Sequence, residues 1–206
     1  MKCILGIKKG MTQIFDENGV CHPVTVVEAT PALVSAVRTT EKEGYVAVQL
    51  ASGEQKAQRL SKAHRGVHNN SRYVREFRFH PSKASVLDDV KTGDTVGVDQ
   101  FEIGDTVAVS ATSKAKGYQG VVKRHNFAGG PKTDGNKHHE RAPGSIGATG
   151  PARVFKGTRM AGRMGGERVT VKNLQVVQVQ PEANLLLLRG AIPGHDGSVI
   201  EVQGRS

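Results

Sequence analysis

The sequence has few of the features that mark secreted, redox-active or membrane-spanning proteins. It contains two cysteines, Cys3 and Cys21, and no tryptophan. These cysteines lack any paired metal-binding spacing, so we expect them to act as small apolar residues of a protein in a reducing compartment. No run approaches the roughly 18 apolar residues that a membrane span needs. Met1–Gly10 holds three lysines and resembles neither a signal peptide nor a transit segment, so we expect a cytoplasmic protein.

Acidic residues are also scarce, and their deficit is confined to one part of the chain. The net charge is +10 and the pI is about 9.8. Residues 1–113 carry 14 basic and 13 acidic side chains, and residues 169–206 carry 3 of each. Residues 114–168 carry 12 basic and 3 acidic side chains. Such a concentrated positive charge is typical of a nucleic-acid binder, with an anionic membrane surface as the alternative partner.

The basic segment Lys114–Arg168, which we call the arm, lacks the pattern of a folded core. It holds 12 of the 25 glycines, and Asn126–Gly166 shows hydrophobic periodicity of neither strand nor helix. Connections inside compact domains usually run about 2 to 6 residues, so a loop of this length has to be functional or disordered. Basic, glycine-rich segments often become ordered on binding RNA. The alternative is a solvated linker.

The flanking sequence predicts a mainly β body made of residues 1–113 and 169–206. Short Val- and Ile-rich runs between Gly, Asn or Pro predict strands, and a hairpin turns at Asp16–Gly19. Many short strands with frequent turns favour a closed or half-closed β-barrel completed across the insertion point of the arm. The expected strands are Cys3–Lys8, Cys21–Glu28, Leu33–Thr39, Tyr45–Leu50, Val169–Val179, Leu185–Arg189 and Val199–Val202.

One or two short helices are also expected. Lys56–His64 places Ala57, Leu60 and His64 on one face, and Lys116–His125 sets Tyr118 and its valines opposite basic residues. The second helix would open the arm and could lay its basic side on a phosphate backbone. A solvated surface helix is the alternative.

No motif supports an enzyme. Gly130–Lys137 lacks the preceding strand and the hydroxyl residue of a phosphate-binding loop. His125, His138 and His139 lack the ligand spacing of a metal site, so they are better read as phosphate or sugar contacts. A barrel oxidoreductase or a metal-dependent nuclease therefore has no recognisable site, and we expect no cofactor, metal or small-molecule substrate. Tyr118, Phe127 and Phe155 could stack on unpaired bases or pack within the protein.

Several separated blocks resemble the third protein of the large ribosomal subunit, a universal family, in its bacterial form. The matching blocks are Gly6–Phe15, Pro23–Glu28, Lys116–Phe127, Pro143–Gly147, Met160–Gly162 with Met164–Gly165, and Asn184–Leu187 through Gly190–Ala191 to Pro193–Gly194. Ala108, Ala111 and Ala115 stand where the family usually has Asp, Gly and Gly, and Glu140 stands where it often has His.

The resemblance implies a structural constituent of the large subunit. It implies a barrel of the type shared with translation elongation factors, RNA binding early in assembly, and an arm that reaches toward the peptidyl transferase centre. The implied partners are large-subunit ribosomal RNA and the fourteenth and nineteenth large-subunit proteins, and the implied location is the cytoplasmic ribosome.

The candidate site residues are mostly basic and lie mostly in the arm. The tip nearest the catalytic centre is expected at Ser145, Ile146, Gly147, Ala148, Thr149, Gly150, Pro151 and Ala152. Phosphates are expected at Lys123, Arg124, Arg141, Arg153, Lys156, Arg159 and Arg163. The complete set of expected RNA contacts adds Lys8, Lys9, Lys114, Lys116, His125, Lys132, Lys137, His138, His139, Ser145 and Arg168.

A methylated glutamine near the arm tip occurs in many bacterial members of the family, but Gly147–Pro151 contains no glutamine. We therefore predict that the arm carries no methylglutamine. Mass spectrometry of proteolytic peptides spanning residues 114–168 tests this. A methyl mass on Gln119, the only glutamine in that range, would contradict the prediction.

Overall fold

The chain divides into two compact units. The computed structural model describes residues 2–68, 70–82, 87 and 90–204. Unit 1 combines the chain up to Ser113 with the chain from Arg168 onward, and unit 2 is Lys114–Glu167. Arg168 is the first residue of a strand of unit 1, so the arm without this residue coincides with unit 2.

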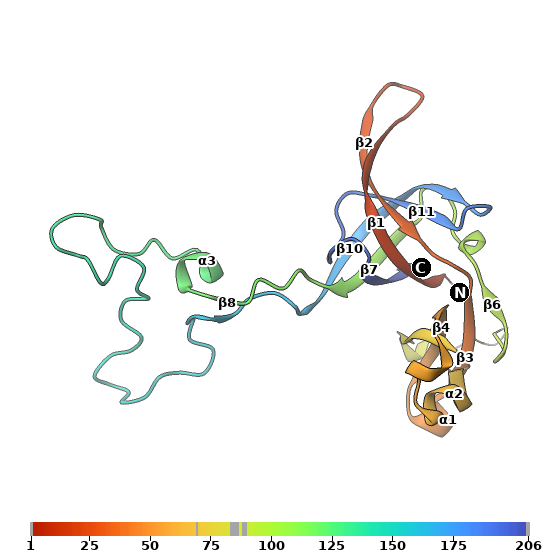
Figure 1. Ribbon diagram of the computed structural model, residues 1–206, viewed down its shortest axis with the longest axis horizontal. Coiled ribbons are helices and arrows are strands. Elements are labelled where there is room, and N and C mark those ends of the chain that lie inside the picture. The colour runs from red at the N-terminus through yellow and green to blue at the C-terminus, as the bar shows by residue number, and fades with distance from the viewer. Residues whose placement is uncertain (1, 69, 83–86, 88–89, 205–206) are drawn as a thin grey trace. The chain divides into compact units, whose positions relative to one another are not determined.

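Unit 1 is built around a closed antiparallel barrel (Figure 1). β1 and β2 form the N-terminal hairpin, whose paired positions run from Ile7↔Glu28 to Phe15↔Cys21. Gly6 lies where β1 passes over β2, since a Cβ there would approach Cγ1 of Val27 to 2.5 Å. Around the ring the strands are β1 (Cys3–Phe15), β12 (Val199–Gly204), β7 (Thr106–Thr112), β10 (Arg168–Gln180), β11 (Leu185–Arg189) and β2 (Cys21–Glu28).

The barrel closes across the insertion point of the arm, as the sequence predicts. β7 ends just before the arm and β10 begins at Arg168, the last residue of the arm, and the two strands pair from Arg168↔Thr112 to Gln175↔Thr106. β12 pairs with both β7 and β1, which joins the C-terminal strand to the N-terminal strand. Both ends of the inserted segment therefore start from neighbouring strands of one hydrogen-bonded ring.

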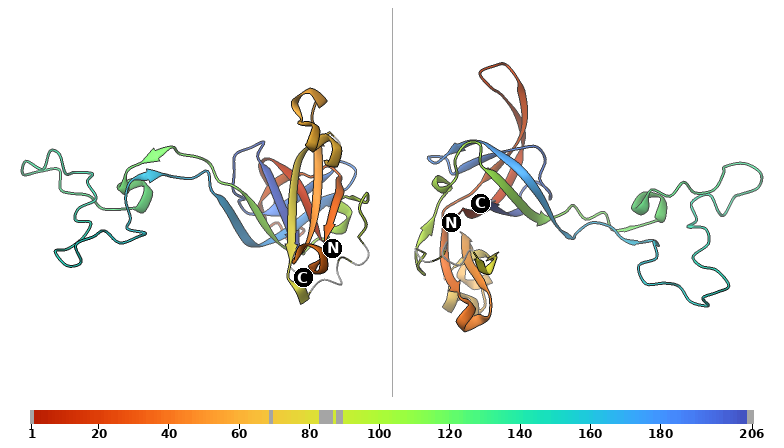
Figure 2. Two further views of the ribbon diagram at one scale, coloured as in Figure 1. Left: turned by 90° about the horizontal axis from the view of Figure 1, so that it is seen from below. Right: turned by 180° about the vertical axis from the view of Figure 1, so that it is seen from behind.

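A second sheet lies beside the barrel, and we call it the outer sheet (Figure 2). Its central strands correspond to predicted strands that the sequence analysis assigned to the barrel, and that assignment is wrong. β5, its edge strand, and β7 of the barrel were not predicted. The strand order is β5 (Ser71–Phe79), β4 (Val46–Glu54), β3 (Ala32–Arg38) and β6 (Thr95–Val96).

β1 supplies side chains to two hydrophobic clusters because successive residues of a strand point to opposite faces. Ile4 joins the barrel core with Val109, Leu188 and others. Cys3 and Leu5 join the cluster of the outer sheet. Cys3 is fully buried, which raises the pKa of its thiol to about 12, whereas Cys21 is exposed. The expectation of a small apolar residue therefore fits Cys3 and is wrong for Cys21.

The helices differ from those predicted. α1 (Thr40–Glu43) was not expected. The predicted helix Lys56–His64 is replaced by a 3₁₀ turn, Ala57–Arg59, and α2 (Lys62–His68). Leu60 between them is extended, and Ser61 Oγ accepts a hydrogen bond from the His64 amide, which is the contact of an N-capping residue. Another 3₁₀ turn, Val98–Gln100, precedes β7.

The predicted helix Lys116–His125 is reduced to α3 (Val121–His125). Tyr118–Gln119 forms the short strand β8 instead, paired with β9 (Gly162–Arg163). Gly120 is extended at the N-cap, and α3 ends at Asn126, which adopts the left-handed conformation common after the last helical residue. Pairing with a strand far along the chain thus overrides the local helical pattern.

Truncation to alanine should destabilise the protein far more in the barrel core than on the surface, at two side chains of equal size. Leu188 is fully buried in that core, whereas Ile103 is 73% exposed. Leu188→Ala should lower the free energy of unfolding by about 2 to 5 kcal/mol through lost burial and a residual cavity. Ile103→Ala, the control, should change it by less than about 0.5 kcal/mol. Urea unfolding measures both, and equal losses would show that the barrel interior is not the principal core.

Candidate nucleic-acid interface

The base of unit 2 is held by a short antiparallel ladder. Tyr118 pairs with Arg163 and Gln119 with Gly162. Beyond them the Lys116 amide donates to the Met164 carbonyl, and the Met164 amide donates to the Gly117 carbonyl, both at 2.9 Å. This ladder fixes the backbone that carries Arg163 and leaves its side chain exposed.

Two of the predicted site residues on α3 support the arm itself. Nη1 of Arg124 and Nε2 of His125 both donate to the Met160 carbonyl, at 2.8 and 3.0 Å. Gly162 makes room for this contact, because a Cβ there would lie 2.6 Å from Nη1 of Arg124. Both side chains are half-buried. Arg124 therefore has donors left over for a phosphate, but part of its capacity already joins two segments of the arm.

A loop carrying four of the predicted contacts is closed at a narrow neck. The Gly130 amide donates to the Glu140 carbonyl at 3.0 Å. Gly129 has φ +77°, and a Cβ there would lie 2.2 Å from the same carbonyl oxygen. Inside the loop, Nδ2 of Asn136 donates to the Pro131 carbonyl at 2.7 Å. These contacts give the loop a defined backbone that presents Lys132, Lys137, His138 and His139 to solvent.

The predicted tip is exposed from Ser145 to Ala152. Oγ of Ser145 donates to the Gly147 carbonyl at 2.7 Å, which folds the start of this segment back on itself. At its other end, the Arg153 amide donates to the Pro151 carbonyl at 2.7 Å. Turns rather than packing therefore shape the tip.

The exposed cations of unit 2 greatly outnumber its carboxylates. Residues 114–167 carry 11 Lys and Arg side chains against three Asp and Glu side chains. The predicted contacts of unit 2 with exposed side chains are Lys114, Lys116, Lys123, Lys132, Lys137, His138, His139, Arg141, Ser145, Arg153, Lys156, Arg159 and Arg163. Most of their amines and guanidinium groups are therefore available to an external anion.

The predicted contacts in unit 1 are differently placed. Lys8 is buried, and its ammonium donates to the carbonyls of Ile192 and Gly194 at 3.1 and 3.2 Å. Lys9 pairs with Glu28 at 2.7 Å, and Arg168 pairs with Glu201. These three basic groups already serve the protein's own structure.

The aromatic residues of unit 2 fall into two groups. Tyr118 is 77% exposed and Phe155 is 59% exposed. The Arg153 guanidinium lies 5.8 Å from the centre of the Phe155 ring, which adds a basic group beside it. Phe127 is half-buried, with its ring 6.0 Å from that of His125. Stacking on unpaired bases remains open to Tyr118 and Phe155, while Phe127 packs within the arm.

The described part of the chain meets the requirements of neither a metal site nor a membrane-spanning helix. No group of three His, Cys, Asp or Glu side chains there could hold a metal ion. No helix among those residues is long and apolar enough to cross a bilayer.

Sequence analysis missed one group of basic residues. Arg72, Arg75 and Arg78 are exposed on β5. The charge total of residues 1–113 hid them, because acidic residues elsewhere in that range cancel their contribution. Because a strand turns successive residues to opposite faces, their spacing of three places Arg75 on the face opposite to Arg72 and Arg78.

Comparison with known proteins gives one consistent result. The model of the family described as ribosomal protein L3 matches residues 83–185, a range that includes the arm and the strands on either side of it. The chain is 51% identical over 195 residues to large ribosomal subunit protein uL3 of Heliobacterium modesticaldum, covering 94% of this chain and 91% of that protein. It is 46% identical to the proteins of the same name from Chloroherpeton thalassium, with 98% of each chain covered, and Streptococcus pyogenes, with 98% of this chain and 96% of that one covered.

A single added methyl group at the closed neck should make the loop more accessible to protease. Gly129→Ala should open the neck, because the new Cβ meets the Glu140 carbonyl and the left-handed conformation costs about 1 to 2 kcal/mol for a residue other than glycine. Trypsin should then cut after Lys132 and Lys137 about tenfold faster. Gly147→Ala is the control, since nothing lies within 4 Å of its Cβ position. Equal cleavage rates in both variants would show that the neck does not hold the loop.

Proposed function

Because the chain belongs to the ribosomal protein L3 family, we propose that its arm binds large-subunit ribosomal RNA and orders RNA near the peptidyl transferase centre. As a member of this family the protein is a structural, non-enzymatic constituent of the large ribosomal subunit and acts in translation on the cytoplasmic ribosome.

The observation that carries the proposal is the excess of exposed cations over carboxylates in unit 2, which holds 11 Lys and Arg side chains against three Asp and Glu side chains. A cation without an internal ion pair can bind a phosphate without breaking a contact in the protein. Each phosphate that it neutralises releases condensed counterions, and this release favours binding. Glycine-rich backbone can also pass close to RNA and present amide groups to phosphates.

The proposed phosphate contacts are not equivalent. Arg124 and His125 hold the Met160 carbonyl, so they act partly by setting the shape of the arm. Lys8 is the least suited of the candidates, since its ammonium is buried and bound to two carbonyls. The main contacts are proposed at Lys123, Arg124, Arg141, Arg153, Lys156, Arg159 and Arg163, with Ser145–Ala152 at the tip.

The family membership supports four finer proposals. The body binds RNA early in subunit assembly, and the inserted arm reaches inward toward the catalytic centre. The fourteenth and nineteenth large-subunit proteins are its neighbours. The barrel is of the type shared with translation elongation factors, which is consistent with its closed antiparallel ring.

Binding to large-subunit ribosomal RNA across a salt series tests the proposal, with the full chain compared with a variant lacking residues 126–166. The deletion removes five of the seven main phosphate contacts: Arg141, Arg153, Lys156, Arg159 and Arg163. The slope of log affinity against log salt should therefore become shallower by about 3.5 to 4.5.

A charge-matched control distinguishes the effect of losing the arm on the salt slope from the effect of losing net charge. Residues 126–166 carry seven basic and two acidic side chains. Replacing five exposed basic residues of unit 1 with glutamine removes the same net charge of five and should leave most of the slope. Suitable positions are Arg59, Lys62, Arg65, Lys91 and Arg189. If both variants flatten the slope equally, or the deletion leaves it unchanged, the arm is not the principal RNA contact.

A further inference from the structure

The N-terminal hairpin continues beyond the barrel ring as a two-stranded ribbon (Figure 1). The pairing of β12 with β1 ends at Ile7, and the pairing of β11 with β2 ends at Val24. Residues 10–15 and 21–23 pair with each other past those points. We call residues 10–23 the ribbon.

One face of the ribbon carries exposed apolar side chains. Alternate residues of a strand share a face, so Met11, Gln13 and Phe15 point to the same side. Cys21 lies directly opposite Phe15, and Pro23 lies directly opposite Gln13, which places both on that side as well. Met11 is 52% exposed and Phe15 is 61% exposed. Because isolated apolar residues on a surface are common, the significant feature is that these residues gather on one face.

The turn of the ribbon is held by hydrogen bonds. Oδ1 of Asp16 accepts from the amides of Asn18 and Val20, at 2.9 and 2.8 Å. The Gly19 amide donates to the Asp16 carbonyl at 3.0 Å, and Gly19 has φ +76°, which glycine adopts without strain. Oδ2 of Asp16 lies 3.2 Å from Nε2 of His22. The backbone around Val20, whose side chain is 51% exposed, is therefore ordered before any partner binds, which lowers the entropy cost of docking.

The ribbon also lies in the part of the chain that lacks basic charge. Residues 10–37 contain no Lys or Arg, whereas 29 such residues in 206 would place about four in a segment of that length. Asp16 and Glu17 are exposed at the turn. The hydrogen bond from the Val20 amide holds the pKa of the Asp16 carboxyl below its usual value, so its negative charge persists at neutral pH. Like charges repel, so this end of the ribbon disfavours phosphates and favours cations.

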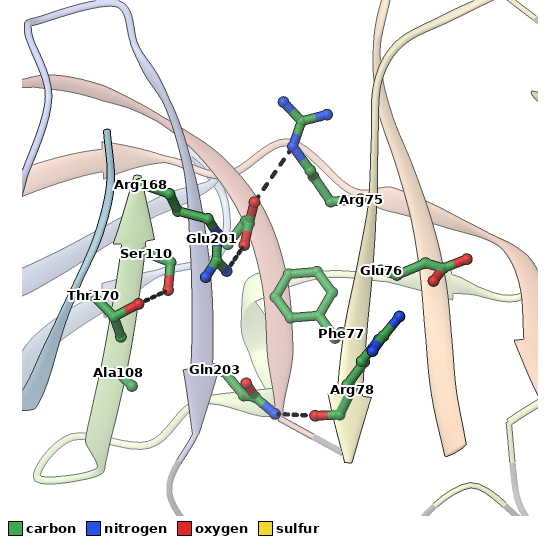
Figure 3. Close-up of a pocket in the computed structure, with 10 residues that line it drawn as sticks. All are labelled: Arg75, Glu76, Phe77, Arg78, Ala108, Ser110, Arg168, Thr170, Glu201 and Gln203. Atoms are coloured by element: carbon green, nitrogen blue, oxygen red, sulfur yellow. Dashed lines mark hydrogen bonds and ion pairs between the residues drawn. The ribbon is translucent and has the colours of Figure 1, made fainter. Parts of the chain in front are cut away.

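Other carboxylates of unit 1 are used within the protein. Glu201 pairs with both Arg75 and Arg168 between β5 and the barrel (Figure 3). Glu28, at the end of β2, pairs with Lys9 at 2.7 Å. Glu17 instead stands exposed at the turn of the ribbon, where a cation of another molecule can reach it.

We propose that the apolar face of the ribbon docks a neighbouring ribosomal protein, through a segment that combines apolar side chains with Lys or Arg. Met11 and Phe15 pack against the apolar residues of that segment, and Asp16 and Glu17 pair with its cations. An apolar centre beside a charged rim is the usual composition of a protein–protein interface. The contact is additional to the RNA binding proposed for the arm, and it rests on the membership of the chain in the large subunit.

The charge of the ribbon favours such a protein over the two other possible occupants. Every nucleotide of RNA brings a phosphate, and the carboxylates of Asp16 and Glu17 would repel it. A second copy of this chain would bring the same two carboxylates to the interface. A basic protein segment brings the opposite charge and can also bury the rings and methyl groups of the face.

Photo-cross-linking from the complete chain in assembled large subunits tests the proposal. A photoreactive benzoylphenylalanine replaces Phe15, which keeps an aromatic ring at an exposed position and so preserves the fold. Irradiation should join it to one ribosomal protein, and the cross-linked peptide, identified by mass spectrometry, should hold more Lys and Arg than Asp and Glu. Thr12 is the matched control, because it is exposed on the opposite face of the same strand. The cross-link to that protein should be lost when the probe stands at Thr12.

Four results from Phe15 would overturn the docking proposal: a cross-link to RNA, a cross-link to a second copy of the chain, an acidic partner peptide, or no cross-link. Equal yields from Phe15 and Thr12 would also contradict it. The same probe at Tyr118, which is 77% exposed in the arm, should join to RNA. If Tyr118 reaches RNA while Phe15 reaches no protein, the docking proposal fails and the proposed function stands. If Phe15 reaches a basic protein segment while Tyr118 reaches no RNA, the docking proposal stands and the proposed function of the arm is contradicted.

Discussion

The pairing of β7 with β10 is the constraint on which the rest of the structure depends. These strands lie before and after the arm, and their hydrogen-bonded register from Arg168↔Thr112 onward completes the barrel ring. The entropy of closing a long loop is met by strand pairing and by burial of residues such as Val109 and Val176 in the barrel core. An inserted segment anchored in this way needs no hydrophobic core of its own. Its residues can be chosen for charge and for backbone freedom.

The two units use their charges differently. Unit 1 pairs Lys9 with Glu28 and places Glu201 between two arginines, so its charges mostly stabilise the protein's own geometry. Unit 2 uses glycines and backbone hydrogen bonds for its shape and leaves its cations exposed. Arg124 serves both purposes, because its guanidinium donates to the Met160 carbonyl and keeps further donors for an anion. This division of roles matches a protein whose body provides a stable base and whose arm binds a polyanion.

Local patterns predicted the strands well where hydrophobic residues dominate. Leu185–Arg189 was predicted with its observed bounds, and the hairpin turn at Asp16–Gly19 lies between β1 and β2 as expected. β5 was missed because arginines and a glutamate interrupt its apolar residues. The helix expected over Lys116–His125 shortened because its first residues pair with β9, more than forty residues along the chain. Such pairing cannot be seen in a window of neighbouring residues.

The sequence alone determined the mainly β character, the place of the inserted arm, its charge and its family, because each depends on composition or on short blocks of residues. Only the tertiary structure decided that β3 and β4 belong to the outer sheet and not to the barrel. It also decided that the Lys8 ammonium is buried and that Glu201 pairs with both Arg75 and Arg168. Those features depend on residues far apart in the chain, whose proximity is set by strand order and register. A charge total over residues 1–113 could not reveal where its charged side chains face, because that depends on strand order and register and not on the sum of the charges.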